Sequence, residues 1–200
     1  ISMFNKKFII FLICLVIHPF TVFAHTFGKE GFYDGISHPV LGLDHLLAMI
    51  CVGILSAQIG GRAIWTVPST FVIIMTIGGF FGFLLIVQQF YFVEIGIILS
   101  VIILGSAICI EKKIPQKLII IFVGIFGLFH GIAHGLEIPA ASSPILFILG
   151  FICGTTALHI FGVFVGHLSI KNKVSLNLLR LTGIIFASYG IYLLLGIFLN

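Results

Sequence analysis

Two short segments of this chain carry four histidines and two carboxylates within otherwise apolar sequence. The six side chains are those of His38, Asp44, His45, His130, His134 and Glu137. An ionisable side chain at the centre of a bilayer costs about 3 kcal/mol on insertion scales, so such residues mark a pathway or a binding site. Imidazole and carboxylate together suit nickel, cobalt, zinc or copper, and we therefore expect a divalent transition-metal ion to bind here.

The composition of the 200-residue chain is that of an integral membrane protein. Hydrophobic residues make up 60% of it, charged residues only 8%, and the mean hydropathy is +1.31. So little polar surface cannot cover a water-soluble globule. The basic residues form no patch interleaved with aromatic residues, so we expect membrane lipid but no nucleic acid as a partner.

The N-terminus has the pattern of a secretory signal peptide. Two lysines precede a short apolar run, and the small-residue sequence Val-Phe-Ala ends at Ala24. We expect residues 1–24 to be removed and residues 25–200 to form a single membrane domain, the alternative being an uncleaved first membrane helix. Cleavage would leave His25 at the mature N-terminus, where its imidazole and the free amine could together collect a metal ion.

Beyond residue 30 the sequence divides into apolar stretches of about the 20 residues that a helical span needs. They lie near residues 36–58, 63–87, 92–110, 118–138, 144–168 and 177–199. The pattern predicts an all-α bundle of six transmembrane helices. If the mature N-terminus lies outside, the basic loops all fall on the cytoplasmic side, as the positive-inside rule requires, and the C-terminus also lies outside.

Helix geometry limits which histidines can share one ion. His130 and His134 are four residues apart on one helical face and can converge on a single metal. His38 and His45 also share a face, but in a straight helix they stand about 10 Å apart, too far for one ion.

Two explanations fit the spacing of His38 and His45. In the first, the helix is broken near Pro39 or Gly42. In the second, which we favour, the helix starts near Pro39 and stays straight, and the two histidines bind the ion one after the other as successive stations. Placed by depth, the ligands then form two tiers. The outer tier contains His38, His134 and Glu137, and the inner tier contains Asp44, His45 and His130.

The fourth predicted span also carries three glycines at four-residue spacing, Gly127, Gly131 and Gly135. Such a ridge lets a neighbouring backbone approach closely, which would bring ligands of two helices within reach of one ion. Ordinary helix packing is the alternative role, and the two roles are compatible.

Two further residues could extend the ion path. His159 lies past the middle of the fifth predicted span and could continue the path inward, or it could be a hydrogen-bonded structural residue. Glu94 begins the third span on the external side, where it could add charge to the entrance or lie in headgroup water.

The segment from His38 to Met49, HPVLGLDHLLAM, resembles the signature of the HupE/UreJ family, and the segment from Phe129 to Glu137, FHGIAHGLE, is similar to the family's other motif. That family contains bacterial nickel permeases associated with hydrogenase and urease maturation, and the resemblance covers nearly the whole chain. It implies a multi-pass protein of the bacterial inner membrane that transports Ni²⁺, with Co²⁺ as the alternative, and binds no permanent cofactor. It also implies that the path is formed by His38, Asp44, His45, His130, His134 and Glu137.

The sequence also limits the possible mechanisms of metal transport. No phosphate-binding GxxxxGK[ST] loop occurs, so we expect a secondary permease that does not use ATP. A divalent cation that enters a negative cell interior gains about 4.6 kcal/mol per 100 mV, twice the single-charge value, so import needs no other driving force.

The alternatives to a permease are an intramembrane metal-dependent hydrolase, for which no HExxH helix is present, and a non-transporting metal sensor or accessory protein. Self-association is left open.

Overall fold

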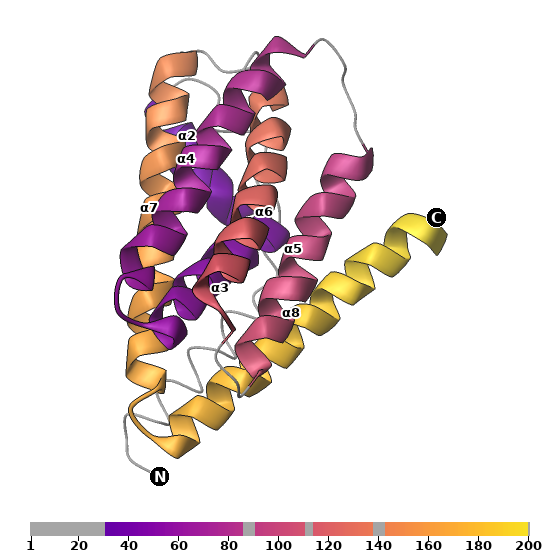
Figure 1. Cartoon of the computed structure of the whole chain (residues 1–200). Coiled ribbons are helices and arrows are strands. Elements are labelled where there is room, and N and C mark those ends of the chain that lie inside the picture. Colours follow the sequence, from indigo (N-terminus) through magenta and orange to yellow (C-terminus); the bar gives the residue numbers. More distant parts are fainter. Residues whose placement is uncertain (1–30, 86–90, 111–113, 138–142, 200) are drawn as a thin grey trace.

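The computed structural model describes residues 31–85, 91–110, 114–137 and 143–199, and within them it contains helices and no strands (Figure 1). The signal-peptide prediction and His25 lie outside this part of the chain. The helices are α2 (Gly31–Leu41), α3 (Leu43–Ile59), α4 (Ala63–Leu84), α5 (Tyr91–Cys109), α6 (Gln116–Glu137), α7 (Pro144–Ser169) and α8 (Lys173–Leu199). Helices are expected because every backbone polar group must be satisfied within the segment when lipid surrounds it.

Five helices, α4 to α8, are long and apolar enough to cross a membrane, and α2 with α3 forms a sixth candidate as a pair bent by 82°. The predicted boundaries of the last five spans agree with these helices to within a few residues. Large apolar side chains such as Trp65, Phe80 and Tyr192 face outward. An outer surface of this kind is stable against lipid rather than water, so this is a multi-pass membrane protein.

Helix α3 forms the centre of the bundle. Every residue from Leu46 to Ala57 is buried, and the helix packs against α4, α5 and α7. A helix that is hydrophobic all round is expected at such a position. The turn from α3 to α4 contains Gly60 and Gly61, both with positive φ, a conformation that favours glycine.

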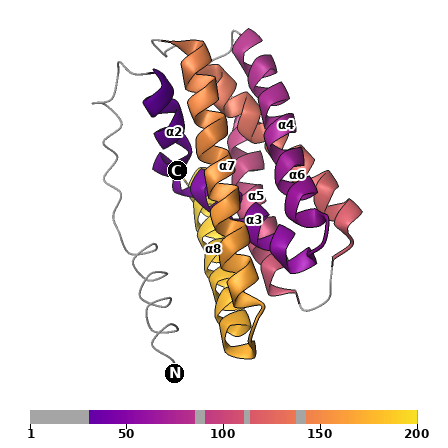
Figure 2. The ribbon, with the colours of Figure 1, turned by 90° about the vertical axis from the view of Figure 1, so that its left-hand side faces the viewer.

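Helix α7 packs along both halves of the bent pair, and α2 lies beside its first half (Figure 2). A Cβ atom at Gly150 would collide with the carbonyl oxygen of Phe32 in α2, and one at Gly162 would collide with that of Ile50 in α3. The absence of side chains at these positions therefore lets one continuous helix hold two differently directed helices.

The glycine ridge of α6 packs against α4. A Cβ at Gly131 would collide with the carbonyl oxygen of Met75, and one at Gly135 with that of Gly79. The predicted close approach is confirmed, but α4 carries no histidine. The expectation that this ridge joins two ligand-bearing helices is therefore wrong, because its glycines face away from α2 and α3 and fix the position of α6 instead.

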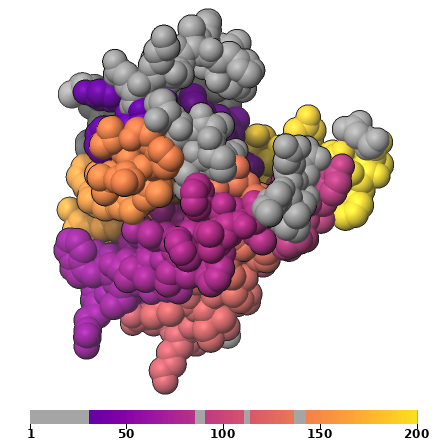
Figure 3. All heavy atoms as spheres, turned by 90° about the horizontal axis from the view of Figure 1, so that it is seen from above, coloured from indigo at the N-terminus to yellow at the C-terminus, as the bar shows by residue number. Residues whose placement is uncertain are grey.

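Helix α8 crosses α5 through Gly105 and Gly183, whose backbones approach closely. Beyond Gly190, which packs against Ile102 of α5, its C-terminal end extends away from the other helices (Figures 1 and 3). Chain direction alternates from α4 to α8, so the turns after α3, α5 and α7 lie at the same end of the bundle (Figure 1). Basic residues at that end are Arg62, Lys117, Lys171 and Lys173.

Candidate functional site

The first predicted span is broken between its two histidines. Helix α2 contains Pro39 and ends at Leu41, Gly42 is extended with φ −93° and ψ 115°, and α3 leaves at 82° to α2. Proline has no N–H to continue the helical hydrogen bonds, which explains a sharp change of direction at this point. The straight-helix reading with Pro39 near the helix start is therefore wrong, and the break alternative holds.

The break brings four histidine rings from three helices into one row. The centre of the His134 ring lies 4.9 Å from that of His38 and 4.5 Å from that of His45, and the His45 ring lies 5.0 Å from His130. The four-histidine row therefore runs His38, His134, His45, His130. The separation into two tiers is wrong, because His134 of the expected outer tier contacts His45 of the expected inner one.

Two of these rings are oriented by hydrogen bonds at Nδ1. The distance from His45 Nδ1 to Asp44 Oδ1 is 2.8 Å, and that from His130 Nδ1 to the carbonyl oxygen of Phe126 is also 2.8 Å. A carboxylate and a carbonyl oxygen only accept, so Nδ1 of each ring carries the hydrogen and donates it. The lone pair of each ring is consequently on Nε2.

Nε2 of His45 and of His130 is buried and has no hydrogen-bond partner among the residues that the structure describes. Buried polar atoms are normally paired, so two unpaired nitrogen lone pairs in adjacent rings call for an explanation. A histidine that binds a metal through one nitrogen usually donates its other N–H to a carboxylate or a carbonyl, which is the arrangement of both rings.

Asp44 has a second role at the start of α3. The backbone N–H of His45 donates to Asp44 Oδ1 at 2.8 Å, so one carboxylate oxygen accepts from both the backbone and the ring of the next residue. The first backbone N–H groups of a helix lack partners within it, and this contact satisfies one of them. Gly42 leaves room for the arrangement, since a Cβ there would lie 3.0 Å from both Asp44 Oδ1 and His45 Nδ1.

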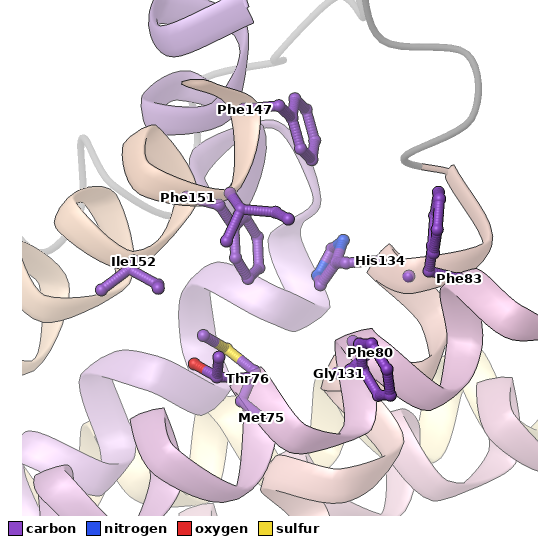
Figure 4. Close-up of a pocket in the computed structure, with 12 residues that line it drawn as sticks. Met75, Thr76, Phe80, Phe83, Gly131, His134, Phe147, Phe151 and Ile152 are labelled. Carbon is purple, nitrogen blue, oxygen red and sulfur yellow. The ribbon is translucent and has the colours of Figure 1, made fainter. Parts of the chain in front are cut away.

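Aromatic rings from α7 and α4 surround the row. Phe151 lies 4.2 Å from His134 between ring centres, and Phe147 lies 5.5 Å from His38. His134 also lines a pocket of about 190 Å³ between α4, α6 and α7, where its ring lies between Phe151 and Phe83 (Figure 4). Sequence reasoning missed these rings, although the four-residue spacing of Phe147 and Phe151 puts them on one face of α7.

His159 lies apart from the four-histidine row but shares an aromatic neighbour with it. The ring centre of the fully buried Phe71 is 5.2 Å from that of His130 and 5.1 Å from that of His159. His159 is 1% exposed, and neither of its ring nitrogens has a hydrogen-bond partner in the described part of the chain. The hydrogen-bonded structural role considered for His159 is therefore not what the structure contains.

The remaining predicted site residues are less informative. Glu137 is the last residue of α6, and its side chain is outside the described structure, as is His25. Glu94 is exposed in the first turn of α5 and is not part of the row. Within the described ranges, no three side chains of His, Cys, Asp or Glu are close enough together to hold one ion.

Comparisons with known proteins agree with one another. The model of the HupE / UreJ protein family matches residues 13–193 of this chain. Protein HupE of Rhizobium leguminosarum bv. viciae is 40% identical over 167 residues, which cover 84% of this chain and 86% of that protein. No solved structure matches the chain at a significant level. The family match therefore covers α2 to α7 and most of α8, up to residue 193.

Proposed function

This chain belongs to the HupE/UreJ family, and from that premise we propose that it is a secondary permease for a divalent transition-metal ion. The cargo is Ni²⁺, with Co²⁺ as the alternative, and no cofactor is permanently bound. The observation that carries the proposal is the four-histidine row, in which rings from α2, α3 and α6 follow one another inside a bundle of membrane-spanning helices. Imidazole is a suitable ligand for nickel and its neighbours in the transition series.

The ion is passed along the row through ring nitrogens. Nε2 of His45 and of His130 provide lone pairs, because Nδ1 of each is held as a donor. Asp44 acts mainly by orienting His45 and by its negative charge, which stabilises a cation in an apolar interior. His38 and His134 precede these residues in the row, and Glu137 supplies a carboxylate where α6 ends.

The orientation of the protein in the bacterial inner membrane follows from the distribution of charge. In the proposed topology residues 1–24 are a cleaved signal peptide, residues 25–200 are one domain of six spans, and both mature termini lie outside. The basic residues at one end of the bundle support this orientation, because cytoplasmic ends are enriched in lysine and arginine. They are Arg62, Lys117, Lys171 and Lys173. The row then lies nearer the outer side, and the membrane potential drives import.

Uptake of radioactive nickel tests the function directly. Cells that express the wild-type chain are compared with cells that express His45→Ala or His167→Ala at equal membrane abundance, with unlabelled cobalt, zinc and copper as competitors. His167 is exposed near the end of α7 and is the matched control. We expect the wild type and His167→Ala to accumulate nickel and His45→Ala to accumulate none above empty cells. Wild-type uptake equal to that of empty cells would contradict transport and favour a sensor or a hydrolase.

A further inference from the structure

A groove with a volume of about 320 Å³ runs between the first half of α4 and the second half of α7. Its wall is formed on α4 by side chains from Ile64 to Ile73 and on α7 by side chains from Thr156 to Val163. Large apolar side chains of this wall are strongly exposed, Trp65 by 73% and Ile160 by 59%. The groove is therefore open to the lipid that surrounds the bundle.

The chemistry and the length of the groove fit one acyl chain of a phospholipid. Most of the wall is apolar, and the Thr156 hydroxyl already donates to the carbonyl oxygen of Ile152 at 2.7 Å. Hydrocarbon can fill such a groove without leaving polar groups of its own unpaired. From Ile64 to Ile73 the groove follows α4 for about 14 Å, at 1.5 Å per residue. The hydrocarbon layer of one leaflet is about 15 Å thick, half of the full core, so the groove spans nearly one leaflet.

Arg62 stands at the point where the groove reaches the end of the bundle. Its backbone angles are helical, φ −69° and ψ −20°, although it precedes the first residue of α4. Residues three and seven positions after it share its helical face, and these are Trp65 and Ser69 of the groove wall. Arg62 is exposed, and among the described residues its guanidinium has no ion-pair partner. Its positive charge is therefore available at the end of the groove.

The distribution of charge in the bundle favours an anionic headgroup at this end. Gly166 of α7 packs on Ala57 of α3, so the turn that follows α7, with Lys171, lies near the turn that contains Arg62. The acidic residues of the described helices lie away from this end, in the first turns of α2, α3 and α5 and at the end of α6. Basic sites between transmembrane helices bind the headgroups of anionic lipids, and the N-terminus of α4 adds backbone N–H groups that favour an anion.

We propose that the groove between α4 and α7 binds an anionic phospholipid, with one acyl chain along the groove and the headgroup phosphate paired with Arg62. Lys171 adds positive charge beside the phosphate. The acyl chain fills the space that separates α4 from α7 here, so binding stabilises the folded protein. The site depends neither on metal transport nor on the orientation of the protein in the membrane.

Trp65 provides a direct test, because it is the only tryptophan of the chain and lies in the wall of the groove. The purified protein is reconstituted into phosphatidylcholine vesicles with a small, fixed share of lipid whose brominated acyl chains quench tryptophan fluorescence on contact. That share is either phosphatidylglycerol or phosphatidylcholine. We expect phosphatidylglycerol to bind about fivefold more tightly, which corresponds to the contribution of about 1 kcal/mol from one basic residue near anionic lipid. Equal quenching by the two lipids would indicate unselective contact with bulk lipid and would overturn the proposal.

Variants at Arg62 test the contact with the headgroup. Arg62→Gln should lose the preference for phosphatidylglycerol, whereas Arg62→Lys, which keeps the charge, should retain most of it. Lys117→Gln is the matched control, because Lys117 is exposed at the same end of the bundle but belongs to α6. A preference that is unchanged in Arg62→Gln would overturn the proposed phosphate contact.

Variants at Ser69 test the contact with the acyl chain and keep the test decisive if Arg62→Gln does not fold. Ser69 is an exposed residue of the groove wall, so Ser69→Phe fills the groove and should abolish the preference. Ser69→Ala leaves the groove open and should bind like the wild type. Because the preference is a ratio of two lipids within one variant, direct effects of the substitution on Trp65 fluorescence cancel. An undiminished preference in Ser69→Phe would overturn the groove as the binding site.

Discussion

The carboxylate of Asp44 and the imidazole of His45 are joined by a hydrogen bond of 2.8 Å between neighbours in sequence. The same carboxylate oxygen accepts from the His45 backbone N–H, so the contact fixes the ring relative to the first turn of α3. The pair stands immediately after the break at Gly42, and the Nε2 atom that it leaves available lies in the row of rings. The direction of α3 thus determines where the Nε2 lone pair of His45 points.

Asp44→Asn tests the orienting role of the carboxylate. The amide oxygen can still accept from Nδ1, but the negative charge is lost and the amide group can also turn its donor toward the ring. Loss of such a partner typically lowers metal affinity or activity by about 10- to 100-fold, and we expect the KM of nickel uptake to rise by that factor. Concentration dependence of initial uptake measures it. Asp34→Asn in the first turn of α2 is the same chemical change outside the row, and a KM that rises equally in both variants would contradict the prediction.

Gly42→Ala tests whether the space beside the pair matters. The backbone angles of Gly42 are accessible to alanine, so no strain in the main chain is expected. The new Cβ would lie 3.0 Å from Asp44 Oδ1 and from His45 Nδ1, and the pair would have to shift. We expect uptake to fall by about tenfold, because small displacements of positioned groups have effects of this order or larger, while thermal stability changes little. Uptake at the wild-type rate by a stable Gly42→Ala protein would show that the pair tolerates displacement.

Gly131→Ala tests the interface that positions α6. Its Cβ would collide with the backbone of α4, and overpacking of this kind destabilises a protein by about 1–3 kcal/mol or more. We expect a lower Tm of the purified protein in detergent and lower membrane abundance. Gly124→Ala, on the same helix, is the control: among the described residues outside the adjacent turns of α6, the nearest atom to its Cβ would be the Thr70 methyl carbon at 3.8 Å. Alanine is the better helix former, so Gly124→Ala should be equally or more stable than the wild type. A common Tm for the two variants would contradict the glycine interface.

Local pattern predicted much of this fold. Apolar stretches of membrane length gave the last five spans, because in lipid each such segment must close its own backbone hydrogen bonds. The residue types of the row were also recognisable, since charged and imidazole groups are rare within apolar spans. The helical face shared by His130 and His134 followed from their spacing alone.

The parts that could not be predicted depend on long-range packing. Pro39 is compatible with a helix start, a kink or a break, and the packing of both α2 and α3 on α7 selects the break. The glycine ridge of α6 indicated a close neighbour without saying which helix it would be. Phe71 is one of many phenylalanines in the chain, and only the positions of α4 and α7 show that it contacts both His130 and His159.

External pH should control transport through the same nitrogen atoms that bind the metal. Because Nδ1 of His45 and His130 already carries hydrogen, a further proton can bind only at Nε2, where it excludes the ion. Metal binding requires neutral imidazole, so protons compete more strongly with the ion as the pH falls. We expect initial rates of nickel uptake to decline as external pH is lowered through about 6, with the membrane potential held constant by a potassium gradient and valinomycin. The decline should appear as a rise in KM that excess nickel overcomes. Equal rates at about pH 5 and about pH 7.5 under subsaturating nickel would count against histidine ligation.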